Sequence, residues 1–178
     1  MFQGPRTFGI ALFLAGGLAI VIGAQTPAPD SEMKGILPSG LGDSVDKDIE
    51  RVRAATSAFK TLDSAVSAGY VRDVSHCVDN PPQGAMGYHH ENAALMDDKL
   101  QVDRPEILVY ERMPSGEYRL NGVEYIVPLS AWSREEPPTI MGQKLKKAQS
   151  LGIWYLHVWI WQANPSGVFA DWNPTVKC

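Results

Sequence analysis

The feature that most constrains the fold is the run IWYLHVWIW at residues 153–161, in which only His157 is strongly polar. Its β-branched and aromatic residues favour a strand near the centre of a sheet. Side chains alternate between the two faces of a strand. One face is wholly apolar and is predicted to meet a helix: Trp154, Leu156, Val158 and Ile160. His157 lies on the other face among aromatic residues, either as part of a cavity wall or as a core histidine bonded to a backbone carbonyl.

A hairpin is predicted within residues 105–127, where two β-rich segments flank the turn residues Pro-Ser-Gly. If the loop spans residues 114–117, Glu111 faces Leu120 and Glu124 faces Ile107. The predicted register therefore places both glutamates on one face of the hairpin.

These two carboxylates lie on an otherwise apolar face, where burial without a partner costs free energy. At ~3.3 Å per residue they are roughly 13 Å apart, too far to bind the same ion. We expect Glu124 to join a site, because Gly122 beside it would leave open space. The alternative for each glutamate is an ion pair with a nearby arginine: Arg104, Arg112 or Arg119.

Helical periodicity is clearest after Asp43, where apolar residues recur at spacings of three, four and seven as far as Val66. Asp43 can cap the start of this helix, and Gly69 is suited to end it. A second, short helix is predicted from Ile140 to Ser150. The predicted fold class is therefore α+β: an N-terminal amphipathic helix packed on an antiparallel β-sheet, with the short second helix before the last strand.

The first 24 residues have the layout of a secretory signal peptide: Arg6, an apolar run, and small residues ending at Ala24. Two glycines interrupt the run, which is shorter than the roughly 20 residues of a membrane-spanning helix, so an uncleaved anchor is the weaker alternative. Residues 25–42 are rich in Pro, Gly and Ser and predict a flexible linker. Residues 43–178 then form a single globular domain of a secreted or periplasmic protein.

The charge of the chain argues against nucleic acid as a partner. The formal net charge is −4, and the only basic cluster is short: Lys144, Lys146 and Lys147. An acidic chain has no electrostatic attraction to a phosphate backbone. We expect no contact with a membrane beyond the signal peptide, and the sequence leaves the oligomeric state open.

The chain has two cysteines, Cys77 and the terminal Cys178. In an exported protein an even number of cysteines predicts a disulfide. Closing a loop of about 100 residues is worth up to ~4.7 kcal/mol in the chain-entropy model. The alternative is a reactive thiol at Cys77 beside His76.

Half of the four histidines lie side by side in the segment GAMGYHHEN, residues 84–92. Adjacent side chains point in different directions, so His89 and His90 seldom face the same ion. A site made of His89, His157 and Glu124 would combine two imidazoles with one carboxylate. This ligand set suits a divalent transition metal such as zinc, copper or iron.

Several stronger motifs are absent. A zincin helix needs His-Glu-x-x-His, but Ala94 stands at the last position. The Pro-Cys-x-x-Cys of zinc deaminases is missing, as are a Gly-x-Ser-x-Gly nucleophile elbow and a phosphate-binding glycine loop.

The sequence therefore predicts a protein that binds a small molecule or a transition metal. Three aromatic residues would surround the ligand: Tyr88, Tyr125 and Trp159. Trp172 would close the cavity as a lid. If the protein is an enzyme, a bound metal would activate water, with Glu124 or Glu111 as a ligand or general base. The rival hypothesis is a non-catalytic module of the cell envelope that presents tryptophans on its surface: Trp159, Trp161 and Trp172.

Overall fold

The computed structural model describes Met1, Gly4 and residues 38–178. The predicted signal peptide and most of the predicted linker lie outside these described residues. Within the described part, no helix is both long and apolar enough to cross a membrane.

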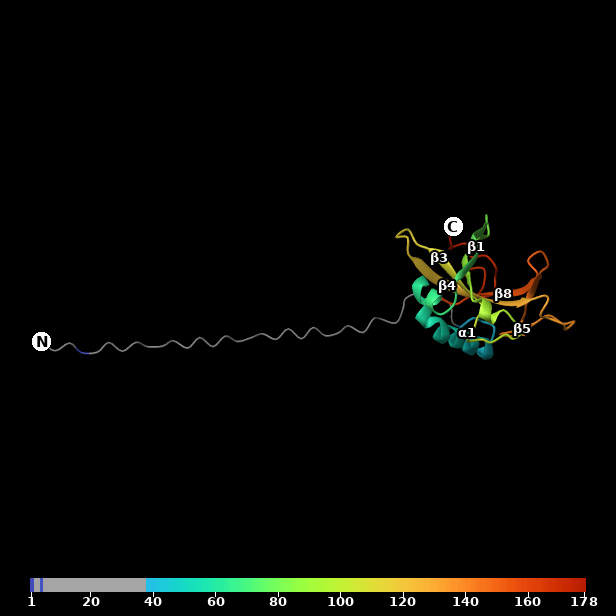
Figure 1. Ribbon diagram of the computed structural model, residues 1–178, viewed down its shortest axis with the longest axis horizontal. Coiled ribbons are helices and arrows are strands. Elements are labelled where there is room, and N and C mark those ends of the chain that lie inside the picture. Colours follow the sequence, from blue (N-terminus) through green and yellow to red (C-terminus); the bar gives the residue numbers. More distant parts are fainter. Residues whose placement is uncertain (2–3, 5–37) are drawn as a thin grey trace.

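A curled antiparallel sheet of six strands forms most of the molecule (Figure 1). Its strands follow the spatial order β1-β2-β3-β4-β8-β7. Their bounds are β1 Arg72–Asn80, β2 Gly84–Glu91, β3 Ile107–Arg112, β4 Tyr118–Pro128, β8 Ile153–Trp159 and β7 Lys146–Ala148. A separate two-stranded ladder joins β5, Thr139–Ile140, to β6, Gln143–Lys144.

Both α-helices precede the sheet in the chain. Helix α1 spans Asp43–Thr56 and is followed by a 3-10 turn, η2, at Ser57–Phe59, and by helix α2 at Leu62–Ser67. Gly69 follows α2 with φ 101°, a left-handed conformation that turns the chain toward β1. A further 3-10 turn, η3, occupies Ala93–Leu95.

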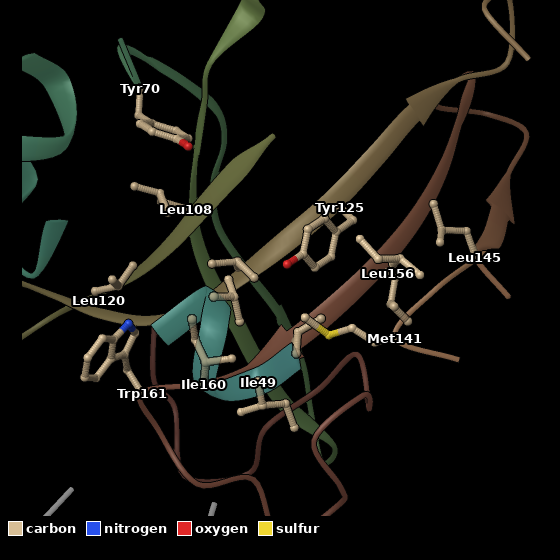
Figure 2. Packing of buried hydrophobic residues seen from close by; sticks show 14 of the residues in the cluster. Ile49, Tyr70, Leu108, Leu120, Tyr125, Met141, Leu145, Leu156, Ile160 and Trp161 are labelled. Carbon is tan, nitrogen blue, oxygen red and sulfur yellow. The ribbon is translucent and has the colours of Figure 1, made fainter. Parts of the chain in front are cut away.

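The main core lies between α1 and one face of the sheet (Figure 2). Ile49 of α1 is fully buried there, as are Val158 and Ile160 near the end of β8. The apolar face of β8 thus meets the helix, as its alternation predicts. Trp161 follows the end of the strand and also joins this core, where its indole Nε1 donates to Thr56 Oγ1 at 3.1 Å.

A smaller apolar cluster lies on the opposite face of the sheet. It contains Ile107 and Val109 of β3 and Ile126 of β4, with Met96 and Tyr155 packed against them. Neither α1 nor α2 contributes a residue to this cluster. This face of the sheet forms the floor of the cavity described below.

The predicted α+β fold class is wrong, because the fold is mainly a curled antiparallel sheet and the predicted second helix does not form. Residues 140–150 contribute to β5, β6 and β7 instead. Met141 and Gly142 both have positive φ, which makes a tight turn between β5 and β6. Lys147 then pairs with Trp154 in the sheet, and this pairing outweighs the modest helical propensity of the lysines.

The predicted hairpin register holds at one end and fails at the other. Ile107 pairs with Glu124, as predicted, but Glu111 pairs with Arg119 and not with Leu120. A bulge between Val109 and Tyr110 accounts for the shift, because one extra residue, Asn121, enters β4. The bulge turns Leu120 into the main core.

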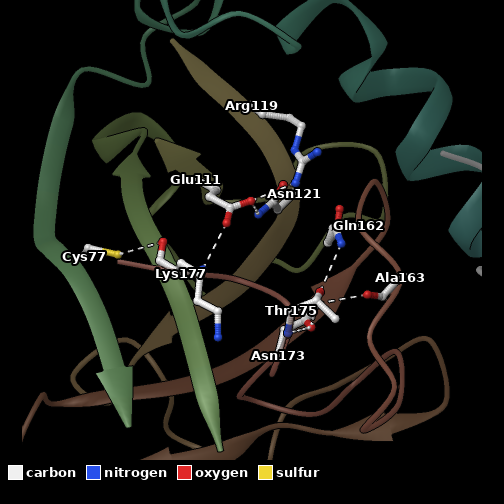
Figure 3. A network of polar contacts seen from close by, with 9 residues as sticks. All are labelled: Cys77, Glu111, Arg119, Asn121, Gln162, Ala163, Asn173, Thr175 and Lys177. Carbon is white, nitrogen blue, oxygen red and sulfur yellow. Dashed lines mark hydrogen bonds and ion pairs between the residues drawn. The ribbon is translucent and has the colours of Figure 1, made fainter. Parts of the chain in front are cut away.

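Glu111 does not line the cavity described below and is held by polar contacts elsewhere. Its Oε2 accepts from Arg119 Nη2 at 2.8 Å and from Asn121 Nδ2 at 3.3 Å (Figure 3). Its Oε1 accepts from the backbone N–H of Lys177 at 3.0 Å. The alternative prediction for Glu111, an ion pair with a neighbouring arginine, is therefore confirmed.

The C-terminal tail returns across the start of β2. Cys77 and Cys178 form a disulfide, as predicted. Asn173 exchanges two backbone hydrogen bonds with Ala85, at 3.0 and 3.1 Å. Gly84 is needed here, because a Cβ at this position would collide with the backbone carbonyl of Asn173. The tail thereby places Trp172 beside the sheet face that carries the smaller cluster.

Candidate functional site

A cavity of about 710 Å³ opens on the face of the sheet that carries the smaller cluster. Apolar side chains from all six strands of the sheet line it, together with the turn before β8 and Trp172 of the tail. In addition to Tyr155, four polar side chains line the cavity: Ser75, His89, Glu91 and Glu124. No lysine or arginine of the described chain is among its lining residues.

His89 projects into this cavity from β2. Gly87, two residues earlier, has φ 109°, and a Cβ there would collide with the carbonyl of Tyr110. This glycine lets β2 lie close to β3 just before the histidine. The His89 side chain is buried, and its Nδ1 lies 2.8 Å from Ser75 Oγ.

The contact with Ser75 sets the tautomer of His89. The Ser75 hydroxyl donates to the backbone carbonyl of His76 at 2.9 Å, so its oxygen is left to accept. Nδ1 of His89 therefore carries the proton and donates to Ser75 Oγ. The Nε2 atom consequently keeps a lone pair, which is available to a ligand.

Glu124 lies in β4, paired with Ile107 on one side and with His157 on the other. Its Oε2 is 3.7 Å from Nε2 of His89, too long for a direct hydrogen bond. Gly122 does not leave open space beside it, contrary to the prediction. A Cβ on Gly122 would lie 2.6 Å from the carbonyl oxygen of Val158, so this glycine instead allows β8 to pair closely.

Burial keeps both side chains uncharged near neutral pH. It raises the pKa of Glu124 to about 8, with nearby Asp171 adding to the shift and Lys146 opposing it. It lowers the pKa of His89 to about 4, against a smaller upward effect of Asp73. Between these values the glutamic acid offers an O–H donor and the imidazole offers an acceptor.

His157 lies behind this pair and is fully buried. Its ring is 4.6 Å from the ring of Trp159 and 5.9 Å from that of His89, measured between centroids. Within the described chain, neither ring nitrogen has a hydrogen-bond partner. Burial and the neighbouring His89 lower its pKa well below the ordinary value, so the ring is neutral.

The structure brings together the three predicted metal ligands, His89, Glu124 and His157, although His157 does not line the cavity. Trp172 lines it, as expected of a lid. Tyr88 and Tyr125, which were predicted to contact the ligand, do not line the cavity, because side-chain alternation along β2 and β4 places them on other surfaces. Tyr88 packs edge-on against Tyr118, and Tyr125 donates to the carbonyl of Val102 at 2.6 Å.

Trp159 is also absent from the cavity wall. It is 1% exposed, and its Nε1 donates to the carbonyl of Ala170 at 2.7 Å, which anchors the tail. Trp161 is buried as well. Of the three tryptophans expected on an outward-facing surface, only Trp172 is partly exposed.

Two polar residues of the cavity were missed. Glu91 could have been found, because it follows His89 by two residues and so faces the same way along β2. Ser75 carries no such signal. It lies where β1 is irregular, between Asp73 and Cys77, and next to His76 at φ 48°.

Comparison of the chain with protein-family models, with curated proteins and with solved structures finds no match. The kind of ligand that the cavity binds is therefore inferred from the geometry of its side chains.

Proposed function

We propose that this protein binds a small, uncharged and mainly apolar molecule in the cavity, held at its polar end by His89 and Glu124. The observation that carries the proposal is the neutral donor and acceptor, 3.7 Å apart, on the floor of a mainly apolar cavity of about 710 Å³. Ligand sites in proteins commonly combine such a volume with a few convergent polar groups.

The absence of a cationic side chain among the described lining residues supports an uncharged ligand. Burying an anion in a mainly apolar cavity costs free energy unless a charged or hydrogen-bonding partner compensates it. The predominantly apolar lining supports a ligand with a hydrocarbon or aromatic body.

The disulfide is compatible with a compartment outside the cytoplasm. We therefore place the binding event in the periplasm or outside the cell, after removal of the predicted signal peptide. The protein would act there as a carrier or receptor of its ligand.

Binding of the neutral fluorophore N-phenyl-1-naphthylamine tests the proposal. We expect saturable enhancement of its fluorescence by the wild-type protein. Substituting Ile153→Glu, at the half-buried cavity edge, should weaken this binding at least tenfold, because a charge then faces the apolar ligand. Val66→Glu, on the partly exposed face of α2, is the matched control and should bind like wild type. Equal binding by both variants would contradict the proposal.

A transition metal is a second candidate ligand. Nε2 of His89 and a carboxylate oxygen of Glu124 are 3.7 Å apart, slightly more than the roughly 3.3–3.6 Å between two ligands of a tetrahedral ion with bonds of about 2.0–2.2 Å. Ser75 orients His89 as the outer partners of metal-bound histidines do. Against it, no group of three His, Cys, Asp or Glu residues in the described chain is arranged to hold an ion.

Zinc retention separates the two candidates. If a metal is the ligand, the wild-type protein should keep about one equivalent of zinc through dialysis at pH 7.5, and His89→Phe should keep none. Glu135→Gln, on an exposed loop, should retain what the wild type retains. Equal retention by wild type and His89→Phe, or none by either, would exclude a metal at His89.

The buried His157 gives a further prediction. Because both its ring nitrogens lack partners in the described chain, replacing it by leucine removes two unsatisfied polar atoms from the interior. We expect His157→Leu to be neutral or to stabilise the free protein by about 1 kcal/mol, measured by urea unfolding. A loss of stability above about 2 kcal/mol would show that the imidazole makes a favourable contact, as a ligand or water would provide.

A further inference from the structure

We propose that a second hollow of the protein binds the carboxylate of a small organic acid, with Arg112 and Lys177 as its cationic partners. The hollow has a volume of about 490 Å³ and lies beside the β3–β4 hairpin. It shares no lining residue with the cavity of the proposed function. Binding at the second hollow is therefore a separate property, which does not depend on what the cavity binds.

The second hollow forms where strands β2 and β3 part. Their pairing ends at Tyr88 and Tyr110, and β3 continues to Arg112 beyond that pairing. The C-terminal tail contacts β3 there, since the backbone N–H of Lys177 donates to Oε1 of Glu111 at 3.0 Å. The disulfide ties the end of the tail to β1. The end of β3, the hairpin and the tail are thus held around one space.

The lining of the second hollow carries an excess of positive charge. Three cationic side chains contribute to it: Arg112, Arg119 and Lys177. Arg119 is paired, because its Nη2 lies 2.8 Å from Oε2 of Glu111 (Figure 3). Arg112 and Lys177 form no ion pair within the described chain. The carboxylate of Cys178 opposes them at the rim, but it pairs with neither, so the two cations are left to attract an anion.

Arg119 also holds an unused donor. Its Nε is buried and has no hydrogen-bond partner among the described residues. Most buried N–H groups in folded proteins are hydrogen-bonded, so this one calls for an acceptor. A ligand oxygen that enters the hollow beside Arg119 would satisfy it.

The lining favours a carboxylate on an apolar body over a bare inorganic anion. A guanidinium group presents parallel N–H donors that match the two oxygens of a carboxylate. Tyr88, Met113 and Pro114 form the apolar part of the wall. The ring of Tyr88 packs edge-on against that of Tyr118, with 5.3 Å between centroids, and so offers a fixed surface to a ligand body. A small organic acid can make both kinds of contact.

Titration of the ¹⁵N-labelled protein with sodium benzoate at pH 7 and low salt tests the proposal. The carboxyl group of benzoate is ionised at this pH. We expect saturable amide shifts around Tyr88, Arg112 and Lys177. Benzamide, which has the same ring without the charge, should bind about tenfold more weakly. Inorganic phosphate, which has charge without an apolar body, should bind several-fold more weakly. Raising the NaCl concentration from about 20 mM to about 300 mM should weaken benzoate binding several-fold.

Two variants connect binding to the named cations. Arg112→Gln and Lys177→Gln each change an exposed side chain, so both should fold like the wild type. We expect each to weaken benzoate binding about fivefold, through the loss of one charge-assisted contact near the surface, and the double variant to weaken it further. Arg51→Gln and Lys47→Gln, on the exposed face of α1, remove the same charges elsewhere and should bind benzoate like the wild type.

The outcomes separate this site from the cavity. Unchanged binding by the double variant, or benzamide that binds as tightly as benzoate, would overturn the role of the two cations. Phosphate that binds as tightly as benzoate would overturn the organic acid in favour of an inorganic anion. Shifts confined to the cavity around His89 would likewise overturn the second site. None of these results bears on binding of N-phenyl-1-naphthylamine by the cavity, whose absence would contradict the proposed function alone.

Discussion

Replacing Glu124 by glutamine is expected to stabilise the protein by an amount that grows with pH. The pKa of Glu124 rises from 4.5 to about 8 in the folded protein. Below pH 4.5 the carboxyl is protonated in both states, so this group then makes no pH-dependent contribution. Between pH 4.5 and 8 the unfolded chain loses the proton and the folded chain keeps it, so wild-type stability falls by about 1.4 kcal/mol per pH unit on account of this group.

Glutamine does not titrate, so the variant escapes this loss. Its advantage over the wild type should reach about 3–5 kcal/mol near pH 8 and be small at pH 4.5. Urea unfolding at pH 5, 6.5 and 8 measures the difference, with Glu135→Gln on an exposed loop as the control that should show no pH-dependent difference. A difference that stays constant with pH would mean that Glu124 is ionised in the folded protein.

Loss of the disulfide is the second large effect. Cys77 and Cys178 close nearly the whole described sheet and tail into one loop, with a sequence separation of 101 residues. The Cys77→Ser, Cys178→Ser double variant should lose about 2–5 kcal/mol of stability, because its unfolded state gains the freedom that the cross-link removed. Urea unfolding in the absence of a reductant measures this loss.

The same change should weaken ligand binding. The tail that ends at Cys178 holds Trp172 against the cavity, together with the backbone hydrogen bonds between Asn173 and Ala85. We expect the double-serine variant to bind N-phenyl-1-naphthylamine several-fold more weakly than the wild type. Dithiothreitol should weaken binding by the wild type and leave the variant unchanged. A stability loss below about 1 kcal/mol would contradict the role assigned to this cross-link.

The sequence predicted correctly the features that follow from side-chain alternation along a strand, and the disulfide expected of an exported chain with two cysteines. The apolar face of β8 meets α1, and Ile107 pairs with Glu124, because both follow from side-chain alternation along a strand. The disulfide followed from counting cysteines in a chain with a predicted signal peptide.

The errors arise where tertiary contacts override local preference. Within residues 140–150, Lys146–Ala148 pair with the edge of β8, and the residues before them pair in the separate β5–β6 ladder. Asn121 enters β4 as an extra residue, so every register estimate beyond it shifts by one. Strand β1 was not predicted, since its residues carry neither clear alternation nor an apolar run.

The candidate site was predicted in part. His89, Glu124 and His157 lie close together, although they come from three separate strands. Alternation alone excludes Tyr125 from the cavity, because it follows Glu124 directly in β4 and so faces the main core. Ser75, which fixes the tautomer of His89, is a contact between strands that no local pattern records.

The central claim is that a neutral ligand occupies the cavity beside His89 and Glu124. The most direct test is a titration of the ¹⁵N-labelled protein with N-phenyl-1-naphthylamine at pH 6.5, followed by amide chemical shifts. The account predicts saturable shifts concentrated at the cavity floor, around His89, Ile107 and Ile126. Shifts confined to the opposite face around α1, or no saturable shift at all, would contradict it.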